Sequence, residues 1–288
     1  APELVSNNLT WEKVTTADIG VDLTLFDNRL NFTGDIYRRN TKDMLTLGEV
    51  LPGVLGANLP KENSADLKTT GFDLTVSWRD QIKLAGKPLE YSLEFNLSDS
   101  KSEITKFSNP TGTLNSYYKG QKIGEIWGLT SDGLYKSDEE AQKGPDQTEI
   151  LIAPSQYPTV AGSLKYKDLN NDGKITRGKY TLDDHGDLTV IGNDQIRYRF
   201  GATFAANWSG FDISAFFQGV MKHNYYPTAS DKIFLGKYSA PWFDQLEGHY
   251  FDRWKEDNPN LDAYWPVLSH RNASTADREM NIPQTRYL

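Results

Sequence analysis

Residues 194–221 read DQIRYRFGATFAANWSGFDISAFFQGVM, and this stretch decides the fold class. From Ile196 to Trp208 every even position is apolar, while the odd positions are charged, polar or small. Ser209 and Gly210 interrupt the run, and from Phe211 onward the apolar residues stand at odd positions. Successive side chains of a strand point to opposite faces, so each half of the stretch has one apolar face. Two such strands of about ten residues around a tight turn are typical of a membrane-spanning β-hairpin.

The same pattern occurs twice more in the chain. The sequence predicts spanning hairpins at about residues 18–38, 72–97 and 195–221, with short internal turns such as Asp27-Asn28. The segments between and after them, about 44–66, 98–194 and 223–285, are predicted to be long loops. Outer-membrane barrels alternate tight periplasmic turns with large extracellular loops in this way.

The long loops are expected to contain structure of their own. Residues 98–194 far exceed the length of about 12–15 residues at which structureless loops become uncommon. Ser137 to Glu140 has the form of a capping box and predicts a short helix. A second, amphipathic helix is predicted from apolar residues at helical spacing, namely Phe243, Leu246, Tyr250 and Trp254.

Composition narrows the classes of protein. The 288 residues are 38% hydrophobic, and no apolar run approaches the roughly 18 residues that a membrane helix needs. The absence of cysteine rules out disulfides and thiolate metal sites. A net charge of −8 without a basic cluster argues against binding to nucleic acid. Ala1 is not followed by a signal peptide, which favours the interpretation that the chain does not begin at a natural N-terminus.

Six spanning strands are too few to close a barrel, because the smallest barrels have about eight. Open sheet edges would leave backbone groups unsatisfied in lipid. Either further strands exist, with 117–129 and the C-terminus as candidates, or the chain is part of a larger barrel, which its abrupt ends favour. The predicted fold class is therefore all-β: a fragment of a large antiparallel transmembrane β-barrel with long extracellular loops that contain short helices.

The sharpest local chemical signal is an acidic loop. Asp168, Asn170 and Asp172 occupy the first, third and fifth positions of a calcium-binding loop, and Gly173 stands at its sharp turn. The carbonyl of Lys174 would be the next ligand, although the twelfth position lacks the usual glutamate. We expect a structural calcium ion here. The alternative is an Asx-rich turn that water solvates and that needs no metal.

An ordered series of segments resembles the C-terminal part of the barrel of SusC/RagA-like TonB-dependent outer-membrane transporters. The segments are residues 128–140, 162–175, 190–193, 252–259 and 283–288. The resemblance implies that a plug domain fills a 22-stranded barrel, that a SusD-like surface lipoprotein forms a lid, and that a TonB complex supplies energy. It also implies that the plug domain and the closing strands lie outside this chain.

The resemblance also suggests which acid closes the acidic loop. In the family the closing acid comes shortly before the segment that corresponds to residues 190–193, which points to Asp187. An apparent insertion at residues 177–184 separates the two halves of the loop, so Asp183 and Asp184 compete for this role.

Aromatic residues in the predicted extracellular loops are candidates for stacking on sugars or for contact with the lipoprotein. They are Tyr117, Tyr118, Trp127, Tyr225, Tyr226, Trp242, Tyr264 and Trp265. The alternative, which we favour for more than half of them, is that they pack the small cores of the loops. A second set of residues is expected to face the lumen, where it would tune passage or pair with the plug: Arg197, Arg199, Glu90, Glu94 and Asp73.

Two functions of different classes follow. The first is an outer-membrane, TonB-dependent importer of glycan fragments or peptides; the second is a soluble extracellular calcium-dependent binding module with a β-sandwich fold. An enzyme is not expected, since the four histidines are scattered and no catalytic constellation is visible. The direction of the apolar faces separates the two: a transporter exposes to lipid the side chains that a sandwich would bury together, namely Ile196, Phe200, Phe204, Phe211 and Phe217.

Overall fold

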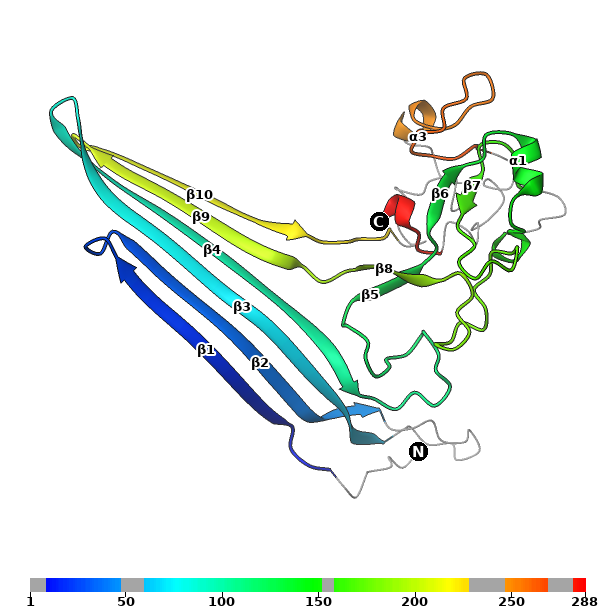
Figure 1. Ribbon diagram of the computed structural model, residues 1–288, viewed down its shortest axis with the longest axis horizontal. Helices are drawn as coiled ribbons and strands as arrows, with labels where there is room; N and C mark the ends of the chain where they lie inside the picture. The colour runs from blue at the N-terminus through cyan, green and yellow to red at the C-terminus, as the bar shows by residue number, and fades with distance from the viewer. Residues whose placement is uncertain (1–8, 48–59, 152–157, 228–246, 269–281) are drawn as a thin grey trace. The chain divides into compact units, whose positions relative to one another are not determined.

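The computed structural model describes residues 9–47, 60–151, 158–227, 247–268 and 282–288 (Figure 1). The chain divides into two compact units. The first is drawn from Ala1–Pro110, Ser116–Gly124 and Gln195–His223, and the second from Thr111–Asn115, Glu125–Asp194 and Asn224–Leu288.

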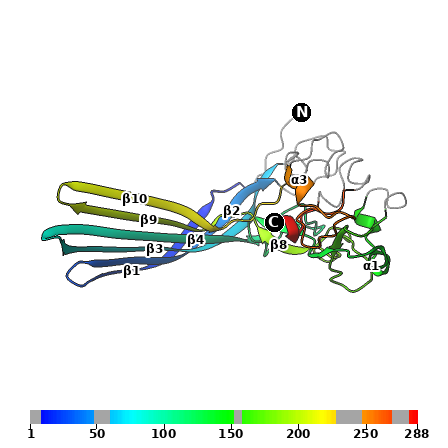
Figure 2. The same cartoon turned by 90° about the horizontal axis from the view of Figure 1, so that it is seen from above.

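The first unit is one antiparallel sheet of six strands in the order β1-β2-β3-β4-β9-β10, and the strands form a single layer (Figures 1 and 2). The strands are β1 (Lys13–Leu25), β2 (Leu30–Leu47), β3 (Lys61–Leu84), β4 (Lys87–Lys106), β9 (Arg197–Trp208) and β10 (Phe211–Lys222). All three predicted hairpins are present.

The three short turns lie at one end of this sheet. They follow Leu25, Leu84 and Trp208, and the register places these strand ends at the same edge. Each turn contains residues with positive φ, for example Asn28 at 66° and Gly210 at 87°. Such values suit tight hairpin connections.

The strands extend further from these turns than the sequence predicts. β2 continues to Leu47 and β3 begins at Lys61, so both ends of the predicted 44–66 loop are strand. β4 likewise continues to Lys106, into the predicted 98–194 loop. The second turn is also tighter than predicted, because only Ala85 and Gly86 separate β3 from β4.

The sheet has one apolar face, as the alternation predicts. Phe204 is opposite Leu93, which is opposite Trp78, so large apolar side chains form rows across the strands. They are not buried by a second sheet, since Phe211 is 70% exposed and Phe217 is 65% exposed. Phe204 is exposed as well, and Phe200 is half-buried. Ile196 differs from the prediction, because it lines a pocket together with residues of the polar face such as Asp73 and Arg199. A β-sandwich would bury these side chains, so the sandwich interpretation does not fit this sheet.

The second unit contains short elements around its own core. It has the two-stranded sheets β5 (Glu125–Gly128) with β8 (Thr189–Asn193) and β6 (Ser131–Leu134) with β7 (Leu164–Tyr166), the helices α1 (Asp138–Lys143) and α3 (Glu247–Phe251), and the 3-10 turns η2 (Thr148–Ile150) and η4 (Thr285–Tyr287). Its fully buried side chains include Leu129, Tyr135, Ile150, Leu164, Tyr166, Ile175 and Leu188. This core confirms that the long connection after β4 folds into structure of its own.

The C-terminal segment is part of this second unit. The amide of Leu129 donates to the carbonyl of Pro283 at 2.8 Å, and the amide of Thr285 donates to the carbonyl of Leu129 at 3.1 Å. The suggestion that 117–129 and the C-terminus are missed spanning strands is therefore wrong for the described residues. β5 is only four residues long, and residues 285–287 form a 3-10 turn.

Of the two predicted helices, the first is capped as predicted and the second is shorter than predicted. Ser137 caps α1 as predicted, because its hydroxyl accepts the amide N–H of Glu140 at 3.2 Å. α3 ends at Phe251, so Trp254 follows the helix instead of completing it, and Phe243 and Leu246 lie outside the described residues. No helix in the described ranges is long and apolar enough to cross a membrane.

Candidate functional site

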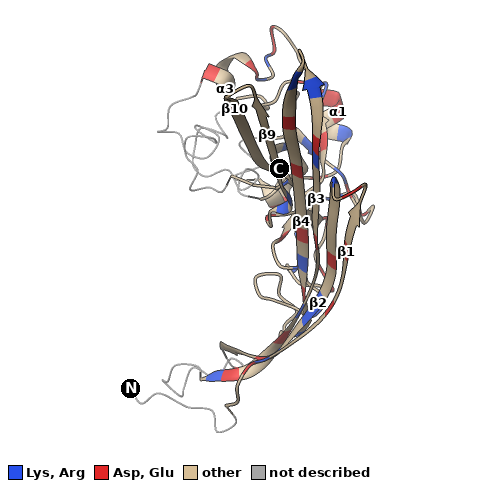
Figure 3. Ribbon diagram, turned by 90° about the vertical axis from the view of Figure 1, so that its left-hand side faces the viewer, with Lys and Arg blue, Asp and Glu red and all other residues tan. Residues whose placement is uncertain are grey.

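The strands of the six-stranded sheet carry charged residues of both signs (Figure 3), and the strand register places several of them on the polar face. Asp73 is opposite Ser98, which is opposite Arg199, and Glu94 is opposite Thr203. Close to the short turns a cavity of about 660 Å³ is lined by residues of this face together with neighbours, among them Arg29, Arg79, Asp80, Glu90, Asn207 and Asp212. The strand register thus places Asp73, Glu90, Glu94 and Arg199 on the face where the sequence predicts them.

Arg197 departs from this expectation. Tyr198 has a φ of 54°, which interrupts the regular strand conformation at this point. The guanidinium of Arg197 forms a two-pronged ion pair with Asp99, and Asp99 is the cross-strand partner of the apolar Phe72. The Arg197 side chain is therefore bound to a carboxylate of its own sheet, and alternation alone could not reveal this partner.

The acidic loop closes on itself as a tight turn. The Asp168 carboxylate accepts the amides of Asp172 at 3.3 Å and Gly173 at 2.8 Å. Asn170 accepts the Asp172 amide at 3.0 Å, and Asp172 accepts the Lys174 amide at 2.8 Å. Gly173 has a φ of 80°, which explains glycine at this position. The side chains of Asp168, Asn170 and Asp172 therefore gather around one turn, as the sequence predicts.

Asp187 anchors the acidic loop to the buried core of the second unit. It is fully buried, and its two carboxylate oxygens accept the amides of Leu169 at 2.8 Å and Thr176 at 2.7 Å. Of its two competitors, Asp184 forms an ion pair with Lys179 at 3.6 Å, and a hydrogen bond from Thr181 lowers the pKa of the Asp183 carboxyl.

The predicted calcium ligands are oxygen atoms of the acidic loop and of Asp187. Within the described ranges, no group of three or more His, Asp and Glu side chains is arranged to hold a metal ion. The oxygen donors of the loop are of the type that calcium prefers. Calcium binding by Asp168, Asn170, Asp172, the Lys174 carbonyl and Asp187 therefore stays a prediction.

The candidate aromatic residues fall into two groups. Tyr118, Tyr226 and Trp265 are buried, and the Tyr226 hydroxyl donates to the carbonyl of Ile282 at 3.0 Å. These three side chains pack the interior of the loops. Tyr117, Tyr225 and Tyr264 are exposed, Trp127 is half-buried against His185, and Trp242 lies outside the described residues.

The exposed Tyr264 belongs to an aromatic cluster that the sequence did not reveal. Its ring lies 5.2 Å from that of Trp265 and 5.3 Å from that of Tyr287. Arg286 donates to the carbonyls of Ala263 and Tyr264 and so holds the C-terminal turn against this segment. Arg286 and Tyr287 are more than twenty residues away from Tyr264 in sequence, so no local pattern predicts these contacts.

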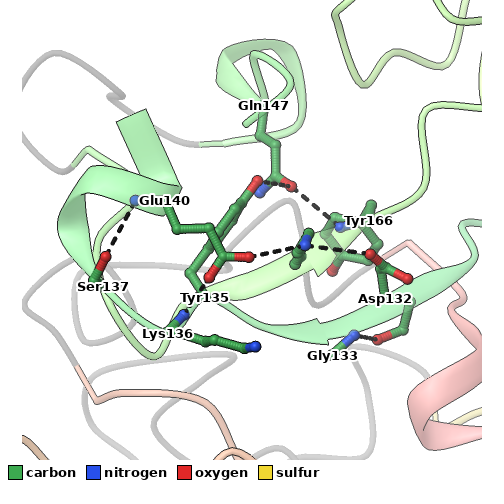
Figure 4. Close-up of polar contacts among 10 residues, drawn as sticks. Asp132, Gly133, Tyr135, Lys136, Ser137, Glu140, Gln147 and Tyr166 are labelled. Atoms are coloured by element: carbon green, nitrogen blue, oxygen red, sulfur yellow. Dashed lines mark hydrogen bonds and ion pairs between the residues drawn. The ribbon is translucent and has the colours of Figure 1, made fainter. Parts of the chain in front are cut away.

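A polar network stabilises the start of α1 (Figure 4). The Glu140 carboxylate accepts the Lys136 amide at 2.7 Å and the Lys165 ammonium at 3.0 Å, and Lys165 also lies 3.4 Å from Asp132. The hydrogen bond from Lys136, followed by that from Lys165, lowers the pKa of the Glu140 carboxyl. The bond to Glu140 in turn raises the pKa of the Lys165 ammonium. The network joins α1 to β6 and β7.

A pH dependence follows from Glu140. Because its folded-state pKa is lowered, its stabilising contribution is complete above its unfolded pKa of about 4.3 and is lost as the pH falls through the folded-state value. We expect Glu140→Gln to lower the melting temperature of the second unit at pH 7 and to have little effect near pH 3. Glu256→Gln, at an exposed position, is the control. Melting curves of both variants and the wild type are recorded from pH 3 to 7. If the melting temperature of Glu140→Gln were lowered by the same amount at every pH, the stabilising role of the Glu140 carboxylate would be contradicted.

The chain is similar to known proteins in both sequence and structure. The family model of the TonB-dependent receptor-like β-barrel matches residues 1–182. The chain belongs to this family. Its antiparallel sheet is accordingly part of an outer-membrane β-barrel, and its apolar face is the lipid-facing side. The family consists of receptors and transporters, and this agrees with the expectation that the chain is not an enzyme.

Individual TonB-dependent receptors match over most of the chain. TonB-dependent receptor P3 of Formosa agariphila is 26% identical over 231 residues, covering 75% of this chain and 21% of the relative. TonB-dependent receptor P39 of the same organism is 23% identical over 94% of this chain and 28% of its own length. TonB-dependent receptor SusC of Bacteroides thetaiotaomicron is 21% identical over 74% of this chain and 20% of its own length. The chain thus spans about a quarter of these relatives.

Solved structures support the same fold. The structure of the RagAB peptide transporter matches with a TM-score of 0.61 and 19% identity, over 95% of this chain and 27% of that one. The RagAB peptide importer in its open-open state matches with a TM-score of 0.57 and 20% identity, over 92% of this chain and 27% of that one. The prediction of a SusC/RagA-like barrel is confirmed.

Proposed function

We propose that the chain is part of a TonB-dependent importer that takes up glycan fragments, with peptides as the alternative cargo, together with a SusD-like surface lipoprotein. The observation that carries this proposal is the two-faced sheet. One face exposes large apolar side chains such as Phe217, and the other carries charged residues beside a cavity of about 660 Å³. Such a sheet separates lipid from a polar passage. Energy would come from a TonB complex that acts on a plug domain.

The cargo class rests on the exposed aromatic residues. Tyr225 is 60% exposed and Tyr264 is 39% exposed, and the carbonyl of Tyr264 is held by Arg286. Exposed tyrosine rings next to polar groups suit stacking on sugars. The relative named SusC and the neighbours titled as RagAB peptide transporters are the reason for keeping both cargo classes.

Uptake by the complete transporter tests the cargo. A host strain that lacks the transporter gene is complemented with the wild type, Tyr225→Ala/Tyr264→Ala, or Tyr250→Ala, and uptake of labelled oligosaccharides and peptides is measured. We expect the double variant to reduce oligosaccharide uptake about 2- to 10-fold, as loss of aromatic contacts of about 0.5–1.5 kcal/mol implies. The Tyr250 ring is also exposed, but Arg253 and Lys255 already lie against it at 5.5 and 4.7 Å, so its variant should match the wild type. Uptake of peptides but not oligosaccharides would reverse the assignment of cargo.

The lipoprotein partner needs a separate measurement. We expect the wild-type transporter, extracted in mild detergent, to co-purify with a surface lipoprotein encoded in the same host. Deletion of that lipoprotein should reduce uptake while the transporter remains in the membrane. Unchanged uptake after the deletion would contradict the partnership.

We also propose that the acidic loop holds a structural calcium ion. The support is the convergence of Asp168, Asn170 and Asp172 on one turn that Asp187 anchors. Millimolar calcium should raise the melting temperature of the wild-type protein, and Asp172→Asn should reduce the rise. Asp183→Asn, which removes a carboxylate outside the turn, should retain it. An unchanged melting curve in calcium would favour the metal-free, water-solvated turn.

A further inference from the structure

Three polar side chains form a row across the apolar face of the first unit, at the end remote from the short turns. Arg38 of β2 is directly opposite Thr70 of β3, and Thr70 is directly opposite Lys101 of β4. Two residues nearer the turns, the same face carries Ile36, Phe72 and Asp99, and Asp99 is paired with Arg197. Because side chains alternate along a strand, Arg38, Thr70 and Lys101 share the lipid-facing side with Ile36 and Phe72.

The height of this row relative to the membrane follows from the register. On β3 this side of the strand extends from Ile82 to Phe72, which is about the length that a tilted strand needs to cross a bilayer. It is apolar except for Asp80 near the turn, which pairs with Arg29 at 3.5 Å. Thr70 lies two residues beyond Phe72, or about 7 Å further along the strand. Long connections mark this end of an outer-membrane barrel as extracellular. The row therefore lies at the level of the outer-leaflet headgroups.

The charges of this row are not neutralised within the sheet. Arg38 and Lys101 are exposed, and neither forms an ion pair in the described part of the chain. Asp99 binds Arg197, and Glu103 lies near enough to Lys101 for a weak electrostatic interaction but forms its ion pair with Lys68 at 3.0 Å. Two cations at an interface, without carboxylates to pair with them, are complementary to an external anion.

The spacing fits a phosphate group. Adjacent strands lie about 4.8 Å apart, so Arg38 and Lys101 are about 10 Å apart at the backbone, with the Thr70 hydroxyl between them. The guanidinium of Arg38 uses its Nε–H for Asn40 at 3.3 Å, which leaves its terminal N–H groups to donate outward. Arginine and lysine converging on one point are well suited to phosphate oxygens.

We propose that Arg38, Thr70 and Lys101 bind a phosphate of an outer-leaflet lipid headgroup. The row adjoins the apolar face directly, so a lipid bound there lays its acyl chains on residues such as Ile36 and Phe72 while its phosphate reaches the cations. A free phosphate ion would have only the polar half of this surface. The inference rests on membership of the barrel family and is independent of the cargo.

The test uses the complete transporter, purified in detergent and stripped of lipid. The protein is titrated with lipid A that carries two phosphates, and bound lipid is counted by native mass spectrometry. We expect Arg38→Gln/Lys101→Gln to weaken this binding about 30-fold, since each cation near an anionic headgroup contributes about 1 kcal/mol. A galactosyl diacylglycerol, which carries no phosphate, should bind the wild type and the double variant equally.

A matched control removes the same charge from the other face. Arg39 and Arg79 are exposed and lie on the polar side of β2 and β3, so Arg39→Gln/Arg79→Gln should bind lipid A like the wild type. Equal weakening in both double variants would overturn the proposal, because it would show a general effect of net charge. Unchanged binding by Arg38→Gln/Lys101→Gln would overturn it as well. So would displacement of lipid A by millimolar inorganic phosphate, which would show a free-anion site.

Discussion

Replacing Phe217 with arginine is expected to destabilise the barrel in a bilayer by about 2–4 kcal/mol, the cost of a cation at the middle of the lipid-facing side. Phe217 is 65% exposed on β10, and its row continues through Ala202 and Phe95 to Val76. This row is close to the middle of the apolar part of each strand. Arginine there cannot reach the headgroups without deforming the membrane, and no carboxylate belongs to the row.

Gln218→Arg is the matched control, because Gln218 is the next residue and faces the polar side opposite Gly201. An arginine at this position reaches water, so we expect a change below about 1 kcal/mol. Urea-induced unfolding of the complete transporter in lipid vesicles, followed by tryptophan fluorescence and by the loss of the heat-resistant band on gels, measures both variants. If Gln218→Arg destabilised the protein as much as Phe217→Arg, the assignment of the two faces would be wrong.

Gly162→Ala is expected to produce a large local loss of stability in the second unit. Gly162 has a φ of 77°, and an added Cβ would overlap the ring of Trp254. Its amide donates to Tyr135 at 2.8 Å and its carbonyl accepts from Val267 at 2.8 Å, so the backbone cannot move away freely. Strain in the left-handed region costs about 1–3 kcal/mol, and overpacking adds about the same. We therefore expect a loss of about 2–6 kcal/mol.

Gly173→Ala separates the two causes of this loss. Gly173 also has a positive φ, at 80°, but no atom lies within 4 Å of an added Cβ. Only the backbone strain of about 1–3 kcal/mol then remains. Limited proteolysis of the complete transporter reports on the loops, and the rate of cleavage within residues 125–194 should rise more for Gly162→Ala than for Gly173→Ala. Equal rates would show that Trp254 does not confine this backbone.

The hairpins could be predicted because their signal is local. Wherever one face meets lipid and the other meets water, as from Phe200 to Trp208, the residue types alternate sharply. Beyond the apolar belt both faces are polar, so the alternation fades although the hydrogen-bonded ladder continues. This explains why the sequence pattern from Lys61 to Ala65 predicts a loop, although these residues are the first of β3.

The second unit could be predicted only in part. The Ser137 cap and the turn at Asp168 depend on neighbours within a few residues, and both are present. The core joins residues that are distant in sequence, such as Leu129 and Pro283, and no periodicity reports such a contact. For the same reason the row of Arg38, Thr70 and Lys101 escaped notice, since its members are about thirty residues apart.

The pairing of β4 with β9 has a consequence for the order of folding. Each hairpin joins strands that follow one another directly, but Leu89 meets Trp208 only after the whole connection from Lys106 to Arg197 has been synthesised. Closing a connection of this length costs roughly 4 kcal/mol in chain entropy if it is flexible, and less if much of it has already become compact. This topology therefore favours a folding order in which the hairpins form early and the β9–β10 hairpin joins β4 late.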